Sequence, residues 1–225
     1  MMNSITRNVS ELVRNLPGNV SVVAVSKTRS PEEVLEAYNA GLYTFGENRV
    51  QELTSKKAML PEGINWHLIG HLQSNKVRQA VAAASMIESV DSLRILRMID
   101  SEAAMQQKIV DCLLQVHIAL EETKTGFGIS EIEETDWTTI SGSLSRVRIC
   151  GLMGIATLTD NSDRVRSEFR SLARLFHDTR LRCFSNCSWF KEISMGMSGD
   201  WRIAVEECST IIRVGTLIFG ERIKR

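Results

Sequence analysis

One lysine and one arginine are the charged residues of this sequence whose positions most clearly suggest chemistry. Lys27 follows the apolar run 22–26, and Arg213 lies inside the apolar run 211–214. A lysine amine attacks a carbonyl only when it is neutral, and a partly desolvated position near another cation favours that neutral form. Lys27 is therefore a candidate for imine formation, although a lysine that ends a strand is more often a solvated tip.

Two glycine-containing stretches, 194–199 and 214–216, could hold an anion. Ser198 and Thr216 carry hydroxyl donors, and Gly215 allows backbone N–H groups to approach a ligand closely. Either stretch taken alone is also explained by ordinary turn and cap chemistry. The two together favour a phosphate site.

Arg213 requires an acceptor, because a buried guanidinium stays charged. A carboxylate in the core, such as Glu88, and a bound ligand are equally good candidates from the sequence. His67 and His71 are four residues apart on an expected strand and its exit, so they are weak indicators of a metal site. We expect one of the two histidines to face the pocket and the other to be structural.

The elements that must position these residues follow an alternating pattern. Short β-branched runs alternate with stretches of helical periodicity, as is typical of a parallel α/β sheet. We expect strands at 21–26, 42–45, 65–69, 86–90, 113–119, 147–152, 192–195 and 211–214. Eight strands are the number that closes a (β/α)8 barrel. An open doubly wound sheet would normally carry a glycine-rich phosphate turn after an early strand, and none follows Lys27.

The sequence therefore predicts a single TIM-type barrel domain over residues 1–225, with an extra amino-terminal helix. The carboxyl ends of the strands share one face of such a barrel, and that face holds active sites. Polar or special residues follow five of the expected strands, namely Lys27, Gly46-Glu47-Asn48, Gly70-His71, Ser198 and Gly215-Thr216. We expect these residues to converge.

Two helices are clearly marked in the sequence. Ser30, Pro31 and Glu33 form the pattern of a capping box with proline in the first turn, and Gly41 can end that helix. A later apolar stripe, Val165, Phe169, Leu172 and Phe176, is expected to pack on the sheet, with Arg164, Arg166, Glu168, Arg170 and Arg174 on other faces. We interpret this stripe as core.

Composition excludes several classes of partner. The 225 residues are 43% hydrophobic, and 27 basic residues balance 27 acidic ones, without a basic run that would suggest nucleic acid or membrane binding. No signal peptide or membrane span is recognisable, so we expect a cytoplasmic protein. The five cysteines do not form a disulfide framework, and Cys183 and Cys187 lack a companion pair for zinc, so we expect no metal site.

The chain resembles the pyridoxal phosphate homeostasis proteins. The resemblance rests on the stretches 24–28, 45–52, 66–76, 151–153, 194–198 and 213–220. It implies a barrel like the amino-terminal domain of alanine racemase, which is the PLP fold type III without its second domain, and pyridoxal 5'-phosphate (PLP) as the cofactor. By the same resemblance Lys27 forms the Schiff base, Ser198, Gly215 and Thr216 bind the phosphate, Arg213 meets the pyridine nitrogen, and Asn48 and His67 border the cofactor.

Two residues near the expected site or its supporting helix depart from the family pattern. Cys208 stands where glycine is usual, and Gly154 stands where threonine is common. The segment 180–189 is also unfamiliar. The two single departures leave the fine geometry of the pocket open, and the sequence alone does not show their effect.

The expected function is a non-catalytic PLP carrier in vitamin B6 and amino-acid homeostasis, with PLP-dependent apo-enzymes as candidate acceptors and a monomeric state. The alternative is a PLP-dependent amino-acid racemase, which needs a second acid/base on the opposite face of the imine. In racemases of this type a tyrosine from a separate domain fills that role, whereas here the tyrosines are Tyr38 and Tyr43, both early in the chain. An aldolase that uses the lysine imine without a cofactor is a third hypothesis. Whether the protein is an enzyme, and what its acceptor or substrate is, stays open at this stage.

Overall fold

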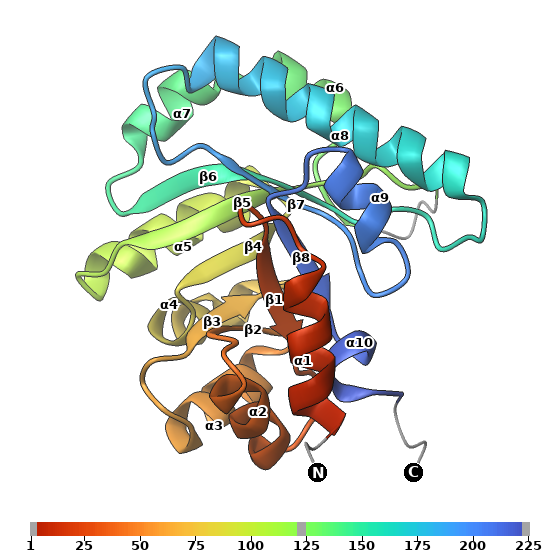
Figure 1. Ribbon diagram of the computed structural model, residues 1–225. Helices are drawn as coiled ribbons and strands as arrows, with labels where there is room; N and C mark the ends of the chain where they lie inside the picture. The colour runs from red at the N-terminus through yellow and green to blue at the C-terminus, as the bar shows by residue number, and fades with distance from the viewer. Residues whose placement is uncertain (1–3, 121–124, 222–225) are drawn as a thin grey trace.

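Eight parallel strands form the centre of the fold and close on themselves in sequence order (Figure 1). The computed structural model describes residues 4–120 and 125–221. The strands are β1 Ser21–Val25, β2 Thr44–Glu47, β3 Asn65–Leu68, β4 Met86–Val90, β5 Val110–Val116, β6 Val147–Gly154, β7 Glu192–Ser194 and β8 Ile211–Val214. The last strand pairs with the first, with Arg213 opposite Val23 and Val214 opposite Ala24. The predicted (β/α)8 barrel is confirmed.

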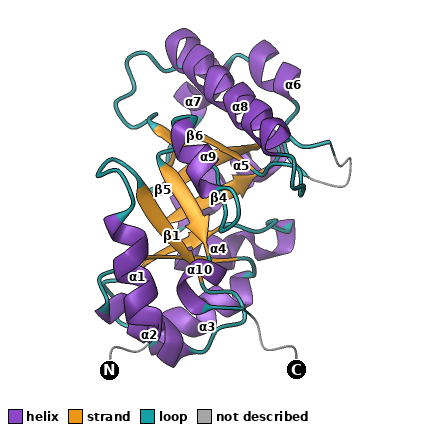
Figure 2. Ribbon diagram, turned by 45° about the vertical axis from the view of Figure 1, so that its right-hand side comes forward, coloured by secondary structure: helices purple, strands orange, loops and turns teal. Residues whose placement is uncertain are grey.

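Helices surround this barrel on its outside, as Figure 2 shows in purple around the orange strands. They are α1 Ser4–Arg14, α2 Pro31–Asn39, α3 Val50–Met59, α4 Val77–Ala83, α5 Leu93–Met105, α6 Ile129–Glu134, α7 Trp137–Ser143, α8 Ser162–Cys183, α9 Trp201–Glu206 and α10 Thr216–Phe219, with a 3-10 turn η1 at Ser74–Lys76. The expected extra amino-terminal helix is α1. It lies beside α10, where Asn8 Nδ2 donates to the carbonyl oxygen of Ile218 at 3.0 Å.

The start and end of α2 follow the predicted capping chemistry. Ser30 is the N-cap, its hydroxyl accepts the backbone N–H of Glu33, and the Glu33 carboxylate accepts the N–H of Ser30 in return. Gly41, just beyond the helix, has a φ of +103°, a conformation that glycine adopts without steric cost. This helix therefore begins and ends where the sequence indicates, directly after the Lys27 turn.

Helix α8 carries the predicted apolar stripe on the barrel. Its side chains Val165, Phe169, Leu172 and Phe176 are buried. Glu168 was expected on another face but is buried as well, because its carboxylate accepts the N–H and the hydroxyl of Thr157, both at 2.7 Å. A charged residue enters the packed face here because its oxygens are fully used by hydrogen bonds.

Two strands are displaced from the predicted bounds. The expected strand 42–45 is found at Thr44–Glu47, so Gly46 and Glu47 lie within the strand and not after it. The expected strand 113–119 is found at Val110–Val116, with the polar side chain of Asp111 paired to Arg148 on the neighbouring strand at 2.6 Å. Each of these strands contains a charged side chain that has a partner in the fold, namely Lys56 for Glu47 and Arg148 for Asp111.

The core has two parts. The larger part packs the outer faces of the strands against the helices and includes Phe45, Trp66 and Phe169. A smaller cluster fills the interior of the barrel and consists of Val23, Leu113, Cys150, Met153 and Ile211. Burial raises the pKa of the Cys150 thiol to about 12, so it behaves as an apolar side chain. The barrel interior is thus packed, which leaves its mouth as the place for ligands.

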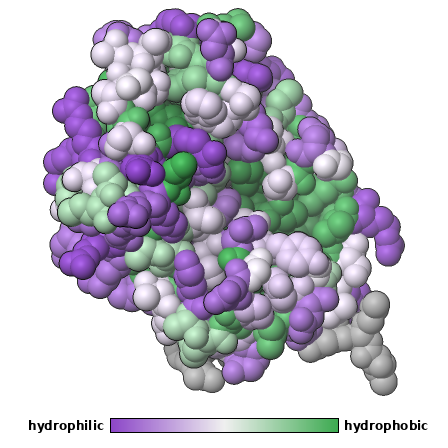
Figure 3. Space-filling view, turned by 90° about the vertical axis from the view of Figure 1, so that its left-hand side faces the viewer, coloured by the Kyte–Doolittle hydropathy of each residue, from purple (hydrophilic) through white to green (hydrophobic). Residues whose placement is uncertain are grey.

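On the face shown in Figure 3, green hydrophobic residues gather in a hollow between purple hydrophilic rims. Within residues 4–120 and 125–221, no helix is both long enough and apolar enough to cross a bilayer.

Candidate functional site

A cavity of about 260 Å³ opens where β1, β7 and β8 end. Its walls include the side chains or backbone of Lys27, Ser198, Arg213, Gly215 and Thr216. These five residues lie up to 189 positions apart in the sequence, from Lys27 to Thr216. Of the five groups expected to converge, the structure brings together those of Lys27, Ser198 and Gly215-Thr216 in this cavity, whereas Gly46-Glu47-Asn48 and Gly70-His71 do not line it.

A tight turn presents Lys27 to this cavity. The carbonyl oxygen of Ser26 accepts the N–H of Arg29 at 2.9 Å, which closes the turn around Lys27 and Thr28. Thr28 has a φ of +65°, and a β-branched residue is rarely found in that left-handed region. Its N–H donates to Glu52 Oε2 at 3.1 Å. Such strain is typically retained at functional sites, where the surrounding structure enforces it.

A buried ion pair lies directly beneath this turn. Glu47 Oε1 accepts hydrogen bonds from the Ser26 hydroxyl and from Lys56 Nζ, both at 2.6 Å, and Lys56 Nζ also donates to the Ser26 carbonyl oxygen at 2.6 Å. Burial raises the pKa of Glu47, although Lys56 and Ser26 oppose that shift. Glu47 Oε2 is buried and forms no hydrogen bond with the residues that the structure describes. The pair fixes the backbone that carries Lys27.

The two glycine turns meet at the opposite wall of the cavity. The N–H of Gly215 donates to Ser198 Oγ at 3.2 Å, which joins the loop after β7 to the start of α10. A Cβ on residue 215 would lie 3.1 Å from the Val25 carbonyl oxygen, so glycine allows β1 and this turn to approach closely. In the described parts of the chain, the N–H groups of Thr216 and Leu217 form no hydrogen bond. They are donors for an anion.

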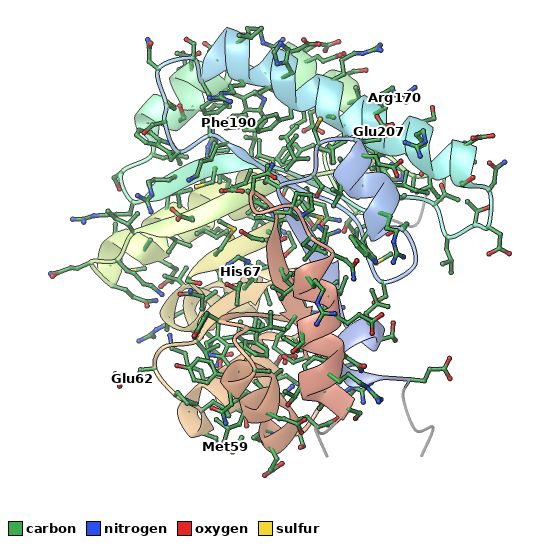
Figure 4. The ribbon with its side chains drawn as sticks, viewed as in Figure 1. Met59, Glu62, His67, Arg170, Phe190 and Glu207 are labelled. Carbon is green, nitrogen blue, oxygen red and sulfur yellow. The ribbon has the colours of Figure 1, made fainter. Side chains whose placement is uncertain are left out.

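Two ionic contacts hold these turns in place from outside. Arg29 pairs with Glu33 at 3.2 Å and donates to the carbonyl oxygen of Gly220, which connects the Lys27 turn to the end of α10. Farther out, Arg170 Nη2 bonds Glu207 Oε1 at 2.8 Å and thereby joins α8 to α9, as Figure 4 shows for the labelled pair. Helix α9 follows the Ser198 turn, so this pair anchors the loop.

Arg213 is buried and lies in the wall of the cavity. Its Nη1 donates to Ser194 Oγ at 2.6 Å, its Nη2 donates to the carbonyl oxygen of Gly154 at 2.8 Å, and Nη1 lies 3.9 Å from Glu88 Oε2. The partner suggested from the sequence, Glu88, is thus near, and the cavity is near as well. A guanidinium has five N–H donors. Hydrogen bonds to the described residues use two of them.

Glu88 is fully buried inside the barrel. It accepts the Ser194 hydroxyl at 2.5 Å and contacts His67 Nδ1 at 2.6 Å. Burial opposes its ionisation, but His67, Arg213 and Ser194 outweigh burial and hold the pKa of Glu88 below the usual value. Burial also lowers the pKa of Arg213, although Glu88 and Asp200 oppose that shift. The result is a carboxylate and a guanidinium bridged by a hydroxyl.

The remaining predicted residues lie around this centre. His67 lies among the strands, where Figure 4 labels it, and contacts Glu88 without lining the Lys27 cavity. Asn48 and His71 line a second cavity of about 440 Å³ at the ends of β2, β3, β5 and β6. His71 Nδ1 pairs with Asp91 at 2.8 Å. Both cavities are therefore at the same end of the barrel.

The two residues that depart from the family pattern have different surroundings. Gly154 supplies the carbonyl oxygen that Arg213 bonds, and a Cβ there would lie 2.7 Å from both Ile118 Cδ1 and Leu172 Cδ2. Cys208 has a φ of +69° and lines a cavity at the amino-terminal ends of β7 and β8, away from Lys27. Cys208 follows the end of α9, the helix after the Ser198 turn, and therefore lies beside the helix that supports the site and not in the Lys27 cavity itself.

Sequence reasoning missed the buried polar groups that support the site. Ser26, Lys56 and Ser194 were not singled out, because each is an ordinary polar residue until the strands are aligned. One signal was available. Glu88 lies inside the mostly apolar run 86–90, and a carboxylate in such a place needs a partner. Together, an amine, a guanidinium, hydroxyls and free N–H groups can hold a ring that carries an aldehyde and a phosphate.

Comparison with known proteins agrees with this geometry. The family model described as "Alanine racemase, N-terminal domain" matches residues 2–223. Pyridoxal phosphate homeostasis proteins of Aquifex aeolicus and of Synechocystis sp. are each 38% identical to this chain, over 89% and 95% of it and over 86% and 97% of the relatives.

Solved structures extend the comparison. PipY of Synechococcus elongatus without PLP superimposes with a TM-score of 0.91 at 36% identity, covering 96% of this chain and 100% of that one. The same protein with PLP bound gives a TM-score of 0.87 at 35% identity. A histidine racemase of Leuconostoc mesenteroides has a TM-score of 0.71 at 17% identity, with 57% of its chain covered, and shares the fold alone. The chain belongs to the family of pyridoxal phosphate homeostasis proteins, whose fold is that of the alanine racemase amino-terminal domain.

Proposed function

We propose that this protein binds PLP reversibly through an imine with Lys27 and serves PLP homeostasis as a non-catalytic carrier. The observation that carries the proposal is the single cavity that brings Lys27 together with Arg213 and the turns of Ser198, Gly215 and Thr216. Relatives at 38% identity bear the name pyridoxal phosphate homeostasis protein, and a structural relative at 35% identity was solved with PLP. The acceptor in this proposal is an apo-enzyme that uses the same cofactor.

The residues present fit the group. The unpaired N–H groups of Thr216 and Leu217 and the hydroxyl of Ser198 match a phosphate, since backbone N–H groups and hydroxyls bind anions well. The unused N–H donors of Arg213 suit the acceptor nitrogen of a pyridine ring. PLP supplies an aldehyde that condenses with amines and, in enzymes, an electron sink.

The residues of this chain would hold that ring without strongly activating it. A guanidinium stays charged, so Arg213 would donate to the ring nitrogen without protonating it, and the ring would withdraw electrons less than one paired with a carboxylate. Lys27 supplies the amine, and the Ser26 turn fixes the backbone from which it extends. This arrangement favours holding the cofactor over turnover.

The placement of the tyrosines disfavours the racemase alternative. Tyr38 and Tyr43 stack edge to face with ring centroids 5.5 Å apart, at the end of α2 and just before β2. That position is at the amino-terminal end of the strands, opposite the end that carries Lys27. Neither tyrosine can act as the acid/base partner of Lys27 in this fold.

Absorbance and reductive trapping test the binding proposal. Purified protein incubated with PLP should develop the near-ultraviolet to violet band of an imine, and borohydride should fix the cofactor to one lysine, identified by mass spectrometry of peptides. Lys27→Ala should remove the band and the adduct, whereas Lys76→Ala, in a separate cavity, should keep both. An adduct that persists unchanged in Lys27→Ala would refute the proposal.

Exchange of the amino-acid α-proton separates carrier from enzyme. PLP-loaded protein is incubated with several amino acids in deuterated water, and exchange and chirality are followed by NMR and chiral chromatography. A carrier leaves the α-proton and the chirality unchanged on the time scale of cofactor transfer to an apo-enzyme. Rapid exchange with racemisation would establish the racemase instead.

A further inference from the structure

A line of buried hydrogen bonds crosses the barrel interior and ends at Arg213. It begins at His67 on β3, passes through Glu88 on β4 and Ser194 on β7, and reaches the guanidinium on β8, with heavy-atom distances of 2.6, 2.5 and 2.6 Å. Of these groups, only Arg213 lines the cavity beside Lys27. The other three can influence a ligand in that cavity only through the arginine.

The direction of the hydrogen bonds follows from the donors available. A guanidinium has no acceptor, so Ser194 Oγ must accept from Arg213 Nη1. The hydroxyl then has its single proton left for Glu88 Oε2, which is the bond observed. Because an ionised carboxylate only accepts, Glu88 determines which way the Ser194 proton points. Removing that charge would free the hydroxyl to turn.

The opposite charges of Glu88 and Arg213 favour the same arrangement of hydrogen bonds. Glu88 and Arg213 are both buried, and Glu88 Oε2 lies 3.9 Å from Arg213 Nη1. The carbonyl oxygen of Gly154 holds the other terminal nitrogen at 2.8 Å. Ser194 and Gly154 therefore fix the plane of the guanidinium from two sides, while Glu88 supplies the negative charge behind it.

We propose that Glu88 is a positioning residue that, through Ser194, orients Arg213 toward the ring nitrogen of the bound cofactor, with His67 holding Glu88 in turn. The inference rests on the proposed function, since it concerns the same cavity. In this proposal Glu88 affects both the affinity for PLP and the electronic state of the bound PLP. A purely structural carboxylate would affect neither.

Glu88→Gln is the test, and Glu168→Gln is the matched control. Both replacements neutralise a buried carboxylate that accepts short hydrogen bonds, but Glu168 bonds Thr157 and Arg164 and has no contact with Arg213. We expect Glu88→Gln to weaken PLP binding by about 10-fold, the loss typical of a charged hydrogen bond, and to shift the absorbance band of the bound cofactor. Glu168→Gln should lower thermal stability and leave affinity and spectrum unchanged.

A double-mutant cycle shows whether the effect passes through the arginine. In an Arg213→Gln background, adding Glu88→Gln should change the spectrum little further, because the group through which it acts is already gone. Ser194→Ala, which removes one hydroxyl, should reproduce the spectral shift and decides the question if Glu88→Gln fails to fold. Folding of each variant is checked by circular dichroism.

The outcomes separate this inference from the binding proposal. If the parent protein forms no PLP adduct at Lys27, the proposed function fails. If the parent binds PLP and the folded Glu88→Gln and Ser194→Ala proteins match it in affinity and spectrum, the positioning role is overturned while binding stands. Spectral effects that add fully in the double variant would also overturn it.

Discussion

Lys56 Nζ donates a hydrogen bond of 2.6 Å to the carbonyl oxygen of Ser26, the residue directly before Lys27. The same ammonium group is 2.6 Å from Glu47 Oε1. The buried side chain of Lys56 thus holds in place the backbone that carries Lys27. Because both members of the ion pair lie away from solvent, each depends on the other.

Lys56→Met should destabilise the protein by about 3–5 kcal/mol, because it leaves the buried Glu47 carboxylate without its counter-charge. Urea denaturation followed by circular dichroism measures this loss. Lys57→Met, one position along α3 at an exposed site, should change the free energy of unfolding by only about 0.5 kcal/mol. The double variant Lys56→Met/Glu47→Gln should be more stable than Lys56→Met alone, and a further loss would contradict the pairing.

Glu88 and Glu47 should affect the pH dependence of stability with opposite sign. The pKa of Glu88 is held below its usual value of 4.5, against burial, by His67, Arg213 and Ser194. Its contribution is therefore present above the unfolded pKa and is lost as pH falls through the folded pKa. The stability of Glu88→Gln should accordingly fall less on acidification than that of the parent.

For Glu47 the sign reverses, because burial raises its pKa above 4.5. The folded state then favours the protonated form more than the unfolded state does, and this contribution to stability is lost as pH rises through the folded pKa. Glu47→Gln should therefore lose less stability than the parent as the pH is raised. Denaturation midpoints measured from about pH 4 to pH 7 test both signs. If the stability of the two variants changed with pH in parallel, the pKa values of Glu47 and Glu88 would not be shifted in opposite directions.

Cys208→Gly should be more stable than Cys208→Ala by about 1 kcal/mol, because residue 208 has a φ of +69° and only glycine adopts that conformation without strain. Thermal denaturation of the pair provides the measurement. Cys187 lacks a positive φ, so Cys187→Gly should show no such advantage over Cys187→Ala. The backbone at position 208 therefore favours glycine.

Gly154→Ala should cost about 1–3 kcal/mol through overpacking, since a Cβ would lie 2.7 Å from Ile118 Cδ1 and Leu172 Cδ2. Ile118→Val removes one of these methyl groups and should recover part of the loss in the double variant. Chemical denaturation of the two single variants and the double variant measures this coupling. Additive losses would indicate that the methyl group is not the obstacle.

The sequence was sufficient to predict part of the Lys27 cavity, although Asn48 and His67, which were expected there, do not line it. Lys27, Ser198, Gly215 and Thr216 follow strands, and parallel strands bring their carboxyl ends to one edge whatever the details of packing. That argument needs only the order of the elements. It also tolerates errors of a few residues in the bounds, such as those at β2 and β5.

The supporting groups could not be predicted in the same way. The bond from Ser26 to Glu47 depends on the pairing of Val25 with Gly46, and the contribution of Lys56 depends on how α3 rotates against the barrel. The hydrophobic periodicity of the sequence predicts neither the pairing of the strands nor the rotation of the helix. For Arg213 the sequence left a core carboxylate and a ligand as alternatives, and in the structure the side chain lies near Glu88 and also in the wall of the cavity.

The pairing of β8 with β1 means that the site is assembled from the two ends of the barrel sequence. Lys27 leaves the ribosome long before Arg213, so the cavity cannot exist until the last strand has closed the sheet. Contacts of such large sequence separation form late and slowly in folding. A ligand that bridges Lys27 and the turns after β7 and β8 would therefore bind only the closed barrel. By mass action it would stabilise the pairing of β8 with β1. Binding of the ligand should therefore indicate that the barrel has folded completely.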